Sequence, residues 1–307
     1  MEQHIVRTGI IGCGGMGSAH VGAIQKHPGF QLVAACDTNP DALASLPAPV
    51  RTFSEAESLF ADADLDLVSI IVPNHLYNPM VRLAAEHGVS VFCEKPLGKD
   101  LADCRQIVSA LRDAGVGGWV SGQRKYLSHI LRARETVAQL QPDFMAGQFT
   151  YSWGHAYGDP RWRGDREKSG GVAVIDSGWH VLDLLSWFVG EPAEAFAELR
   201  FLERHPAIDD KADIRLRYDG AHATLLISYT WPVNRFEFTF AKGGKLVRVD
   251  LDEYTFYENA EVVEQRSKQS DDDAFLSMYG ELHKALDGDR DAYITELGRA
   301  EAIMRVV

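Results

Sequence analysis

A glycine-rich turn near the N-terminus has the residue types and spacing that suit the phosphates of a dinucleotide. The segment reads G-x-G-x-x-G and consists of Gly12, Cys13, Gly14, Gly15, Met16 and Gly17. Gly12 permits a tight turn, Gly14 lets the backbone approach a pyrophosphate, and Gly17 lets a helix pack closely on the preceding strand. The N-terminus of that helix adds N–H groups and a positive dipole end. The motif therefore predicts a dinucleotide site, in preference to a purely structural glycine turn.

An acidic residue follows the glycine turn at the distance at which such sites bind the adenine ribose. Asp37 lies 20 residues after Gly17, at the end of an apolar run, where a carboxylate accepts hydrogen bonds from ribose hydroxyls. It would repel a 2'-phosphate, and residues 38–40 include no Arg or Lys to neutralise one. NAD is therefore expected as the cofactor, with NADP less favoured. Asp37 could also cap the next helix, and the two roles are compatible.

A lysine shortly after the apolar run 89–93 could carry a proton. Glu94, Lys95 and Pro96 directly follow the apolar run 89–93, at the sheet edge where ligands of doubly wound folds bind. Beside a cationic nicotinamide ring the ammonium form of Lys95 would be disfavoured, so this lysine could exchange a proton with a substrate. A solvated lysine in a turn is the alternative explanation of the same spacing.

A second segment places an acid and a histidine together. Asp176 and His180 are four residues apart within a helix expected over 171–188, so both would lie on one face. An acceptor and a proton-transfer group would then point the same way. A lone histidine on an apolar helix is more often a core residue, and that alternative stays open.

The elements that position these groups follow from the hydrophobic pattern. In residues 1–123 short apolar runs alternate with helical periodicity, which predicts a parallel sheet with helices on both faces. The expected strands are 5–11, 31–36, 67–72, 89–93 and 116–120, and the expected helices are 16–26, 54–60, 77–87 and 101–114. Ser54 and Glu57 have the spacing of a capping box, and Gly88 and Gly115 would end two helices.

The pattern changes after Gln123. A helix over 127–140 and a strand over 144–153 precede a loop rich in aromatic residues and arginine over 153–168. Strict alternation follows from about residue 212 to 251, which predicts an antiparallel sheet, and two helices end the chain. The predicted domains are thus 1–123, a Rossmann dinucleotide-binding domain, and 124–307, an α+β domain with a large open, predominantly antiparallel sheet. The row of Phe236, Phe238 and Phe240 could be core beneath the last helices or an exposed face used in self-association.

Composition limits the partners. The formal charge of -13 supplies no cations for a nucleic-acid backbone and disfavours an acidic membrane surface. No apolar run approaches the roughly 20 residues that span a bilayer, so a soluble protein is expected. The four cysteines, Cys13, Cys36, Cys93 and Cys104, form no C-x-x-C pair, which indicates reduced, buried thiols in the cytoplasm and no metal site.

Taken together, these motifs resemble the glucose-fructose oxidoreductase, inositol dehydrogenase and rhizopine-catabolism (Gfo/Idh/MocA) family along essentially the whole chain. The residues that carry the resemblance are the Gly12–Gly17 turn, Pro73, Asn74 and His75, the Glu94-Lys95-Pro96 segment, Arg124, Trp162, Arg163, and Gly170 to His180. The resemblance implies a catalytic trio of Lys95, Asp176 and His180. It also implies cofactor contacts from Pro73, Asn74, His75, Glu94 and Lys95, a Lys95–Pro96 bond that is often cis, and dimers or tetramers formed through the second sheet.

Three features depart from the family pattern. Val172 stands where the family commonly has a third glycine, and Tyr77 and Asn78 stand where it often has a second histidine. Family members also usually continue past the helix that ends at Val307. The first two departures would alter the cofactor and substrate walls more than the chemistry.

The resemblance implies hydride transfer between nicotinamide and a CH–OH or C=O carbon of a sugar, polyol, inositol or related molecule. His180 would exchange the hydroxyl proton, Lys95 would hydrogen-bond the same oxygen, and Asp176 would orient the substrate and Lys95. Arg124, Trp162 and Arg163 are candidates for the substrate wall, although aromatic residues that simply pack would give the same sequence. An NAD-dependent glycosidase and a non-catalytic NAD-sensing regulator on the same fold are the alternatives.

Overall fold

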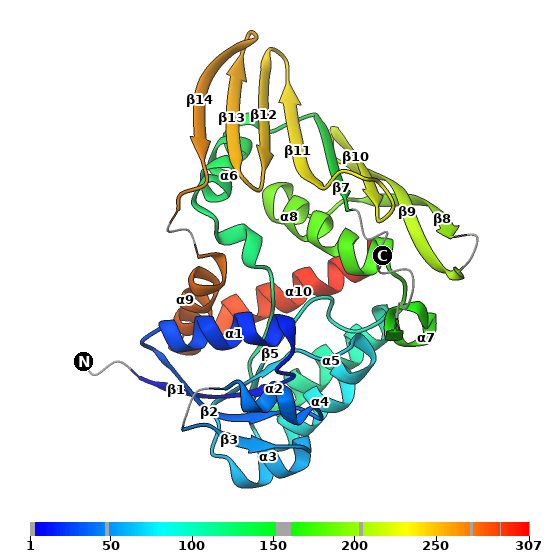
Figure 1. Cartoon of the computed structure of the whole chain (residues 1–307). Coiled ribbons are helices and arrows are strands. Elements are labelled where there is room, and N and C mark those ends of the chain that lie inside the picture. Colours follow the sequence, from blue (N-terminus) through cyan, green and yellow to red (C-terminus); the bar gives the residue numbers. More distant parts are fainter. Residues whose placement is uncertain are drawn as a thin grey trace. The chain divides into compact units, whose positions relative to one another are not determined.

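The computed structural model describes residues 4–46, 49–151, 161–202, 205–270, 273–288 and 290–306 (Figure 1). The chain divides into two compact units. The first contains Met1–Ser121 and Phe275–Met304, and the second contains Gly122–Ala274 and Arg305–Val307.

The sheet of the first unit is parallel and has the strand order β3-β2-β1-β4-β5-β6. Its strands are β1 (Val6–Ile11), β2 (Phe30–Cys36), β3 (Arg51–Phe53), β4 (Leu67–Ile70), β5 (Ser90–Cys93) and β6 (Gly118–Val120). The order changes direction between β1 and β4, and ligands of doubly wound folds bind at the carboxyl ends of the strands near such a point. The predicted Rossmann fold is confirmed.

Helices connect these strands, mostly where the hydrophobic pattern placed them. They are α1 (Gly15–Lys26), α2 (Pro40–Ala44), α3 (Ala56–Asp62), the short η1 (Asn74–Leu76), α4 (Tyr77–Glu86) and α5 (Leu101–Ala114). Gly115 ends α5 in the left-handed conformation with φ 67°, as predicted. The predicted capping box is wrong: α3 begins at Ala56, so its N-cap is Glu55, which makes no side-chain cap hydrogen bond.

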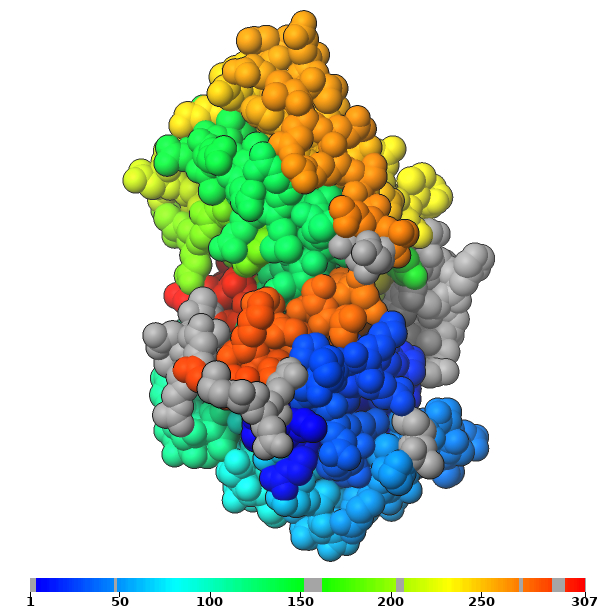
Figure 2. Space-filling model, turned by 90° about the vertical axis from the view of Figure 1, so that its left-hand side faces the viewer, coloured from blue at the N-terminus to red at the C-terminus, as the bar shows by residue number. Residues whose placement is uncertain are grey.

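The last two helices, α9 (Ala274–Leu286) and α10 (Arg290–Val306), pack mainly within the first unit. The ring of Tyr279 lies 5.3 Å from that of Phe30 and 5.4 Å from that of Phe92, so α9 completes an aromatic layer on the parallel sheet. Figure 2 shows α9 (orange) beside α1 (blue) on the surface of this unit. The predicted boundary, which assigned all of 124–307 to one domain, therefore differs from the observed division. Helical periodicity shows that a helix buries one face, but it does not show against which sheet.

The second unit is built on an eight-stranded sheet with the order β14-β13-β12-β11-β7-β10-β9-β8. Its strands are β7 (Phe144–Thr150), β8 (Glu194–Leu202), β9 (His205–Tyr218), β10 (Ala221–Ser228), β11 (Arg235–Lys242), β12 (Lys245–Asp250), β13 (Glu253–Glu258) and β14 (Glu261–Ser267). Strands β7 and β10 pair in parallel and the other neighbours are antiparallel. The predicted α+β domain with a predominantly antiparallel sheet is confirmed.

Helices α6 (Ser128–Leu140) and α8 (Trp179–Val189) pack on one face of this sheet. Shorter helical turns are η2 (Gln123–Tyr126), η4 (Arg161–Gly164) and α7 (Arg166–Ser169). Phe236, Phe238 and Phe240 are at most 5% exposed. The ring of Phe188 in α8 lies 4.9 Å from that of Phe240. The phenylalanine row is therefore core beneath α8, neither an exposed face nor the floor of the last helices.

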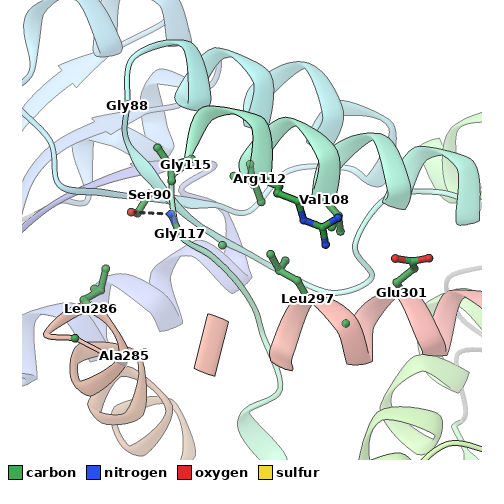
Figure 3. Close-up of a pocket in the computed structure, with 15 residues that line it drawn as sticks. Gly88, Ser90, Val108, Arg112, Gly115, Gly117, Ala285, Leu286, Leu297 and Glu301 are labelled. Atoms are coloured by element: carbon green, nitrogen blue, oxygen red, sulfur yellow. Dashed lines mark hydrogen bonds between the residues drawn. The ribbon is translucent and has the colours of Figure 1, made fainter. Parts of the chain in front are cut away.

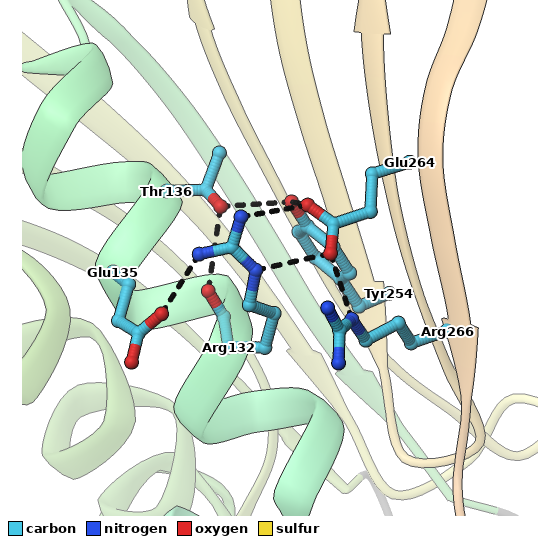
Figure 4. A network of polar contacts seen from close by, with 6 residues as sticks. All are labelled: Arg132, Glu135, Thr136, Tyr254, Glu264 and Arg266. Atoms are coloured by element: carbon cyan, nitrogen blue, oxygen red, sulfur yellow. Dashed lines mark hydrogen bonds and ion pairs between the residues drawn. The ribbon is translucent and has the colours of Figure 1, made fainter.

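A polar network joins α6 to β13 and β14 (Figure 4). The Arg132 guanidinium donates to both carboxylate oxygens of Glu264, at 3.0 and 2.8 Å, and Arg266 donates to the same carboxylate at 2.7 Å. The hydroxyls of Thr136 and Tyr254 lie 2.8 Å apart beside it. These cations, Arg132 first, lower the pKa of Glu264 to about 2.

Within the described residues, the helical stretch Arg166–Val189 is long and apolar enough to cross a membrane by length and composition alone. However, 72% of its apolar window is buried inside the protein, as expected for a core helix.

Candidate functional site

The glycine turn has the geometry that its motif predicts. Gly12 has φ +95°, and a Cβ there would overlap the carbonyl oxygen of Ile71. A Cβ on Gly17 would likewise overlap the carbonyl oxygen of Gly12, so the first turn of α1 passes close to the end of β1. Gly14 and Gly15, by contrast, have no heavy atom within 4 Å of a Cβ position. The space beside them is what a pyrophosphate needs in order to approach the backbone, so the turn fits a dinucleotide.

Asp37, at the end of β2, is held by backbone amides. Its carboxylate accepts a hydrogen bond from the Cys13 amide at 2.7 Å and another from the Asn39 amide at 2.8 Å. The acid therefore fastens the glycine turn to the end of β2. The alternative that Asp37 caps the next helix is wrong, because Asn39 is the N-cap of α2 and accepts from the Asp41 amide.

The predicted cofactor contacts after β4 lie at the same carboxyl edge as the glycine turn. Pro73 precedes the η1 turn, in which Asn74 is 4% exposed and His75 is half-buried. Tyr77 is buried, and Asn78 donates to Asp103 of α5 at 2.8 Å. These last two residues, which replace the family's second histidine, thus support α4 and its contact with α5.

The Glu94–Lys95 segment follows β5, and its two side chains have different surroundings. Lys95 is half-buried and its bond to Pro96 is cis. Glu94 is 5% exposed; one carboxylate oxygen lies 3.0 Å from Nε2 of His20, and the other accepts the Lys95 amide at 3.1 Å. Burial opposes ionisation of Glu94, but His20 and Lys95 outweigh it and lower the pKa of this acid. Its carboxylate thus faces the protein core.

In the second unit, Asp176 is the centre of a cluster of polar side chains. One of its carboxylate oxygens accepts from Nε of Arg163 at 3.0 Å and from the Tyr229 hydroxyl at 3.1 Å. Tyr229 is 4% exposed; burial, and then the charge of Asp176, raise its pKa well above the usual value. The guanidinium of Arg163 also lies 4.4 Å from the ring of Trp162. Two of the three substrate-wall candidates therefore contact Asp176 directly or through a neighbour.

His180 lies one turn further along, and aromatic rings connect it to the third candidate. Its ring is edge-on to Phe149 at 6.2 Å. The Arg124 guanidinium lies 5.5 Å from the ring of Phe149 and 4.8 Å from that of Phe236. The predicted continuous helix from Gly171 is wrong in its first part: Ala173–Gly178 is a π-helical turn, and α8 begins only at Trp179. A π turn inside a helix is frequent at functional sites.

Two buried groups that sequence reasoning missed support this cluster. Asp209 of β9 accepts from the amides of Val172 and Val174, at 2.6 and 3.2 Å, and so caps the π turn from the sheet. Nζ of Lys125 lies 3.2 Å from the carboxylate of Asp183 in α8, and both residues are buried. No local motif in the sequence marks either contact, because the partners lie more than thirty residues apart in the chain.

The candidate residues are thus distributed between the two units. Asp176, His180, Arg124, Trp162 and Arg163 belong to the second unit, and Lys95 and the predicted cofactor contacts belong to the first. The part of the aromatic loop at 152–160 lies outside the described residues. Among the residues that the structure describes, no group of three or more His, Cys, Asp or Glu side chains could hold a metal ion.

A cavity of about 630 Å³ in the first unit contains none of the predicted site residues (Figure 3). Its lining includes Ser90 at the start of β5, Gly118 at the start of β6, and Leu297 of α10. These are the amino ends of the strands, whereas the glycine turn lies at the carboxyl ends. The cavity therefore lies away from the edge where doubly wound sheets bind their cofactors.

Comparison with known proteins identifies the family. Residues 6–121 match the description "oxidoreductase family, NAD-binding Rossmann fold", and residues 141–245 match the Gfo/Idh/MocA C-terminal domain. Both domains therefore match one known architecture, that of an NAD-binding oxidoreductase. The chain belongs to the Gfo/Idh/MocA family.

Individual relatives agree with this assignment. The chain is 28% identical to an uncharacterized oxidoreductase of Streptococcus pneumoniae, over 80% of this chain and 69% of that protein. It is 27% identical to D-xylose 1-dehydrogenase (NADP(+)) 2 of Haloferax volcanii, over 78% of this chain and 74% of that protein. Several other curated relatives are matched over only 48% to 53% of their own length.

The fold is shared with the WlbA dehydrogenase from Bordetella pertussis, whose crystal structure contains NADH and UDP-GlcNAcA. The two structures have a TM-score of 0.84 at 24% identity, over 100% of this chain and 96% of that one.

Proposed function

We propose that this protein is an NAD(P)-dependent oxidoreductase that transfers a hydride between nicotinamide and a CH–OH or C=O carbon of a sugar, polyol, inositol or related molecule. The observation that carries the proposal is the Asp176–Arg163–Tyr229 cluster beside His180, in a chain that also keeps the dinucleotide turn. A regulator that only senses NAD would need the turn but not these acid–base groups. Relatives named as sugar dehydrogenases support the substrate class.

Each catalytic candidate has a distinct role in this proposal. The nicotinamide cofactor supplies the hydride chemistry. His180 accepts the hydroxyl proton in oxidation and returns it in reduction, and Lys95 hydrogen-bonds the same oxygen. Asp176 orients the substrate and Lys95, while Arg163 and Tyr229 fix its carboxylate. Arg124 and Trp162 contribute to the substrate wall, and residues of the Gly12–Gly17 turn, Asp37 and the 73–75 segment hold the cofactor.

The test begins with a screen of NADH formation over polyols, aldoses, inositols and sugar acids. With the best substrate, Lys95→Ala and His180→Ala should each lower kcat by about 100-fold or more, the usual contribution of a general acid–base group. NADH binding, followed by fluorescence, should stay near the wild-type value. Lys99→Ala, in the same loop as Lys95, is the matched control. Wild-type turnover in both catalytic variants would overturn the assignment. Sugar release without net NADH production would favour the NAD-dependent glycosidase.

The proposal extends to NAD as the preferred dinucleotide, because the Asp37 carboxylate would face the ribose 2' position. The ratio of NADH to NADPH affinity measures this preference, and tighter binding of NADPH would contradict it.

We also propose a cytoplasmic homodimer or homotetramer formed through the face of the second sheet opposite α6 and α8. That face carries exposed apolar side chains, among them Phe144 at 44% and Val262 at 55% exposure. The four cysteines are all free and buried, which fits a reducing compartment. Light scattering of the wild type and of Phe144→Glu tests the assembly: a monomeric wild type would rule it out.

A further inference from the structure

A buried chain of hydrogen bonds crosses the first unit from β4 to the end of β5. The hydroxyls of Ser69 and Tyr279 lie 3.0 Å apart, and the Tyr279 hydroxyl lies 3.0 Å from Nδ1 of His20. Nε2 of His20 then lies 3.0 Å from one oxygen of Glu94, whose other oxygen accepts the Lys95 amide hydrogen. Four separate elements, β4, α9, α1 and the end of β5, therefore meet in one polar chain.

Aromatic side chains enclose this chain. The ring of His20 lies 5.3 Å from Phe92 and 5.1 Å from Phe275, and His20, Ser69 and Tyr279 are each 0% exposed. Polar groups buried in such an apolar layer are costly unless each one has a partner. The chain is therefore stable only as a complete set, and removal of one member leaves the next without its partner.

The direction of the hydrogen bond between His20 and Glu94 follows from the two groups. Burial raises the pKa of Glu94, but its partners outweigh burial and lower this pKa below the usual value, so Glu94 is ionised. An ionised carboxylate can only accept hydrogen bonds. Nε2 of His20 must therefore carry a hydrogen and donate it. The hydroxyls of Tyr279 and Ser69, each able to donate and to accept, continue the chain beyond Nδ1 of His20.

We propose that His20, Tyr279 and Ser69 are positioning residues for Lys95. They hold the Glu94 carboxylate where it accepts the Lys95 amide, and so fix the backbone from which the Lys95 side chain projects at the carboxyl edge of the sheet. The inference rests on the proposed function, because it concerns the lysine expected to contact the substrate oxygen. None of the three residues is expected to touch substrate or cofactor.

Tyr279→Phe is the sharpest variant, since it removes one hydroxyl and keeps the aromatic ring. Two readouts are needed: the kinetic constants, and the hydrogen–deuterium exchange rate of the Lys95 amide in the protein without substrate. We expect exchange about three- to tenfold faster and kcat lower by a similar factor, the range set by loss of one buried hydrogen bond. KM and NADH affinity should change by less than about twofold, since their contacts are intact.

Phe275→Leu is the matched control, because Phe275 packs on His20 without joining the hydrogen-bond chain. It should change thermal stability but neither the Lys95 exchange rate nor kcat. If Tyr279→Phe does not fold, Ser69→Ala interrupts the chain at its far end, and His20→Gln retains one donor for Glu94 and should recover part of the protection.

The outcomes separate this inference from the proposed function. Wild-type exchange at Lys95 in Tyr279→Phe and Ser69→Ala would overturn the positioning role, whatever the activity. Wild-type turnover in Lys95→Ala would instead remove the catalytic assignment, and the exchange measurement would still show whether the chain fixes the Lys95 backbone.

Discussion

The two units hold their candidate functional residues in different ways. At the carboxyl edge of the first sheet, the glycine turn offers backbone amides and open space, and the carboxylate of Asp37 is itself held by amides. In the second unit, charged and aromatic side chains hold the candidate acid instead: Asp176 accepts hydrogen bonds from Arg163 and Tyr229. A backbone site tolerates many side chains but few changes of conformation, whereas a side-chain cluster depends on each partner.

This contrast has a consequence for net charge. A chain with a formal charge of -13 can still bind a pyrophosphate, because backbone N–H groups and a helix end supply the attraction. In the second unit, arginine side chains provide the local positive charge near the acids. Overall charge therefore says little about the local charge around either set of candidate residues.

The largest effect expected is from Gly12→Ala, which tests the backbone site. The added methyl would overlap the Ile71 carbonyl at a residue with φ +95°, so we expect destabilisation of about 3 kcal/mol or more and loss of NADH binding. Gly14→Ala is the matched variant, because its surroundings are open. It should keep the wild-type melting temperature and still weaken NADH binding. Equal melting temperatures for the two variants would remove the distinction.

Asp209→Ala tests the support of the side-chain cluster. Loss of the acceptor for the Val172 and Val174 amides should cost about 2 kcal/mol in urea unfolding, the upper range for a helix cap. Burial raises the pKa of Asp209 in the folded protein above its value in the unfolded chain. The protonated carboxyl therefore stabilises the fold below the unfolded pKa, and this contribution is lost as pH rises through the folded pKa. The variant should lack that slope. An unchanged pH dependence would show that another group causes it.

Asp37→Asn sharpens the description of the first unit by removing charge while keeping a hydrogen-bond acceptor for the Cys13 amide. We expect the NADH-to-NADPH affinity ratio to fall by about tenfold, because repulsion of the 2'-phosphate is lost. Thermal stability should fall only slightly, because asparagine has one acceptor oxygen and the exposed hydrogen bond from the Asn39 amide is lost. The two dissociation constants measure the effect, and a constant ratio would mean that Asp37 acts only on the turn.

Glu264→Gln gives the smallest effect and probes the second unit away from the cluster. Its partners, Arg132 first, depress the pKa of Glu264 to about 2, so the ionised form stabilises the fold above pH 4.5 and this contribution is lost as pH falls toward 2. Because the network is partly exposed, we expect a cost of only about 1 kcal/mol at pH 7. Urea unfolding should show the difference shrinking in acid, while kcat stays unchanged.

Sequence reasoning succeeded where the determinants are local. Helix α5 has the predicted bounds, and the need for glycine at position 17 follows from the carbonyl of Gly12 nearby in the chain. Prediction from the sequence failed where residues far apart in the chain determine the local structure. The start of the helix that carries Asp176 depends on Asp209, more than thirty residues away in the chain. The phenylalanine row has the right alternation, but only the packing of α8 shows which face is core.

The return of α9 and α10 to the first unit bears on how the protein forms during synthesis. All six parallel strands have left the ribosome once residue 120 has emerged, yet the helix that covers Phe30 and Phe92 follows more than 150 residues later. Until then the nascent sheet presents an uncovered apolar surface, of the kind that chaperones bind. The parallel sheet is therefore synthesised first but is among the last parts of the chain to complete its packing.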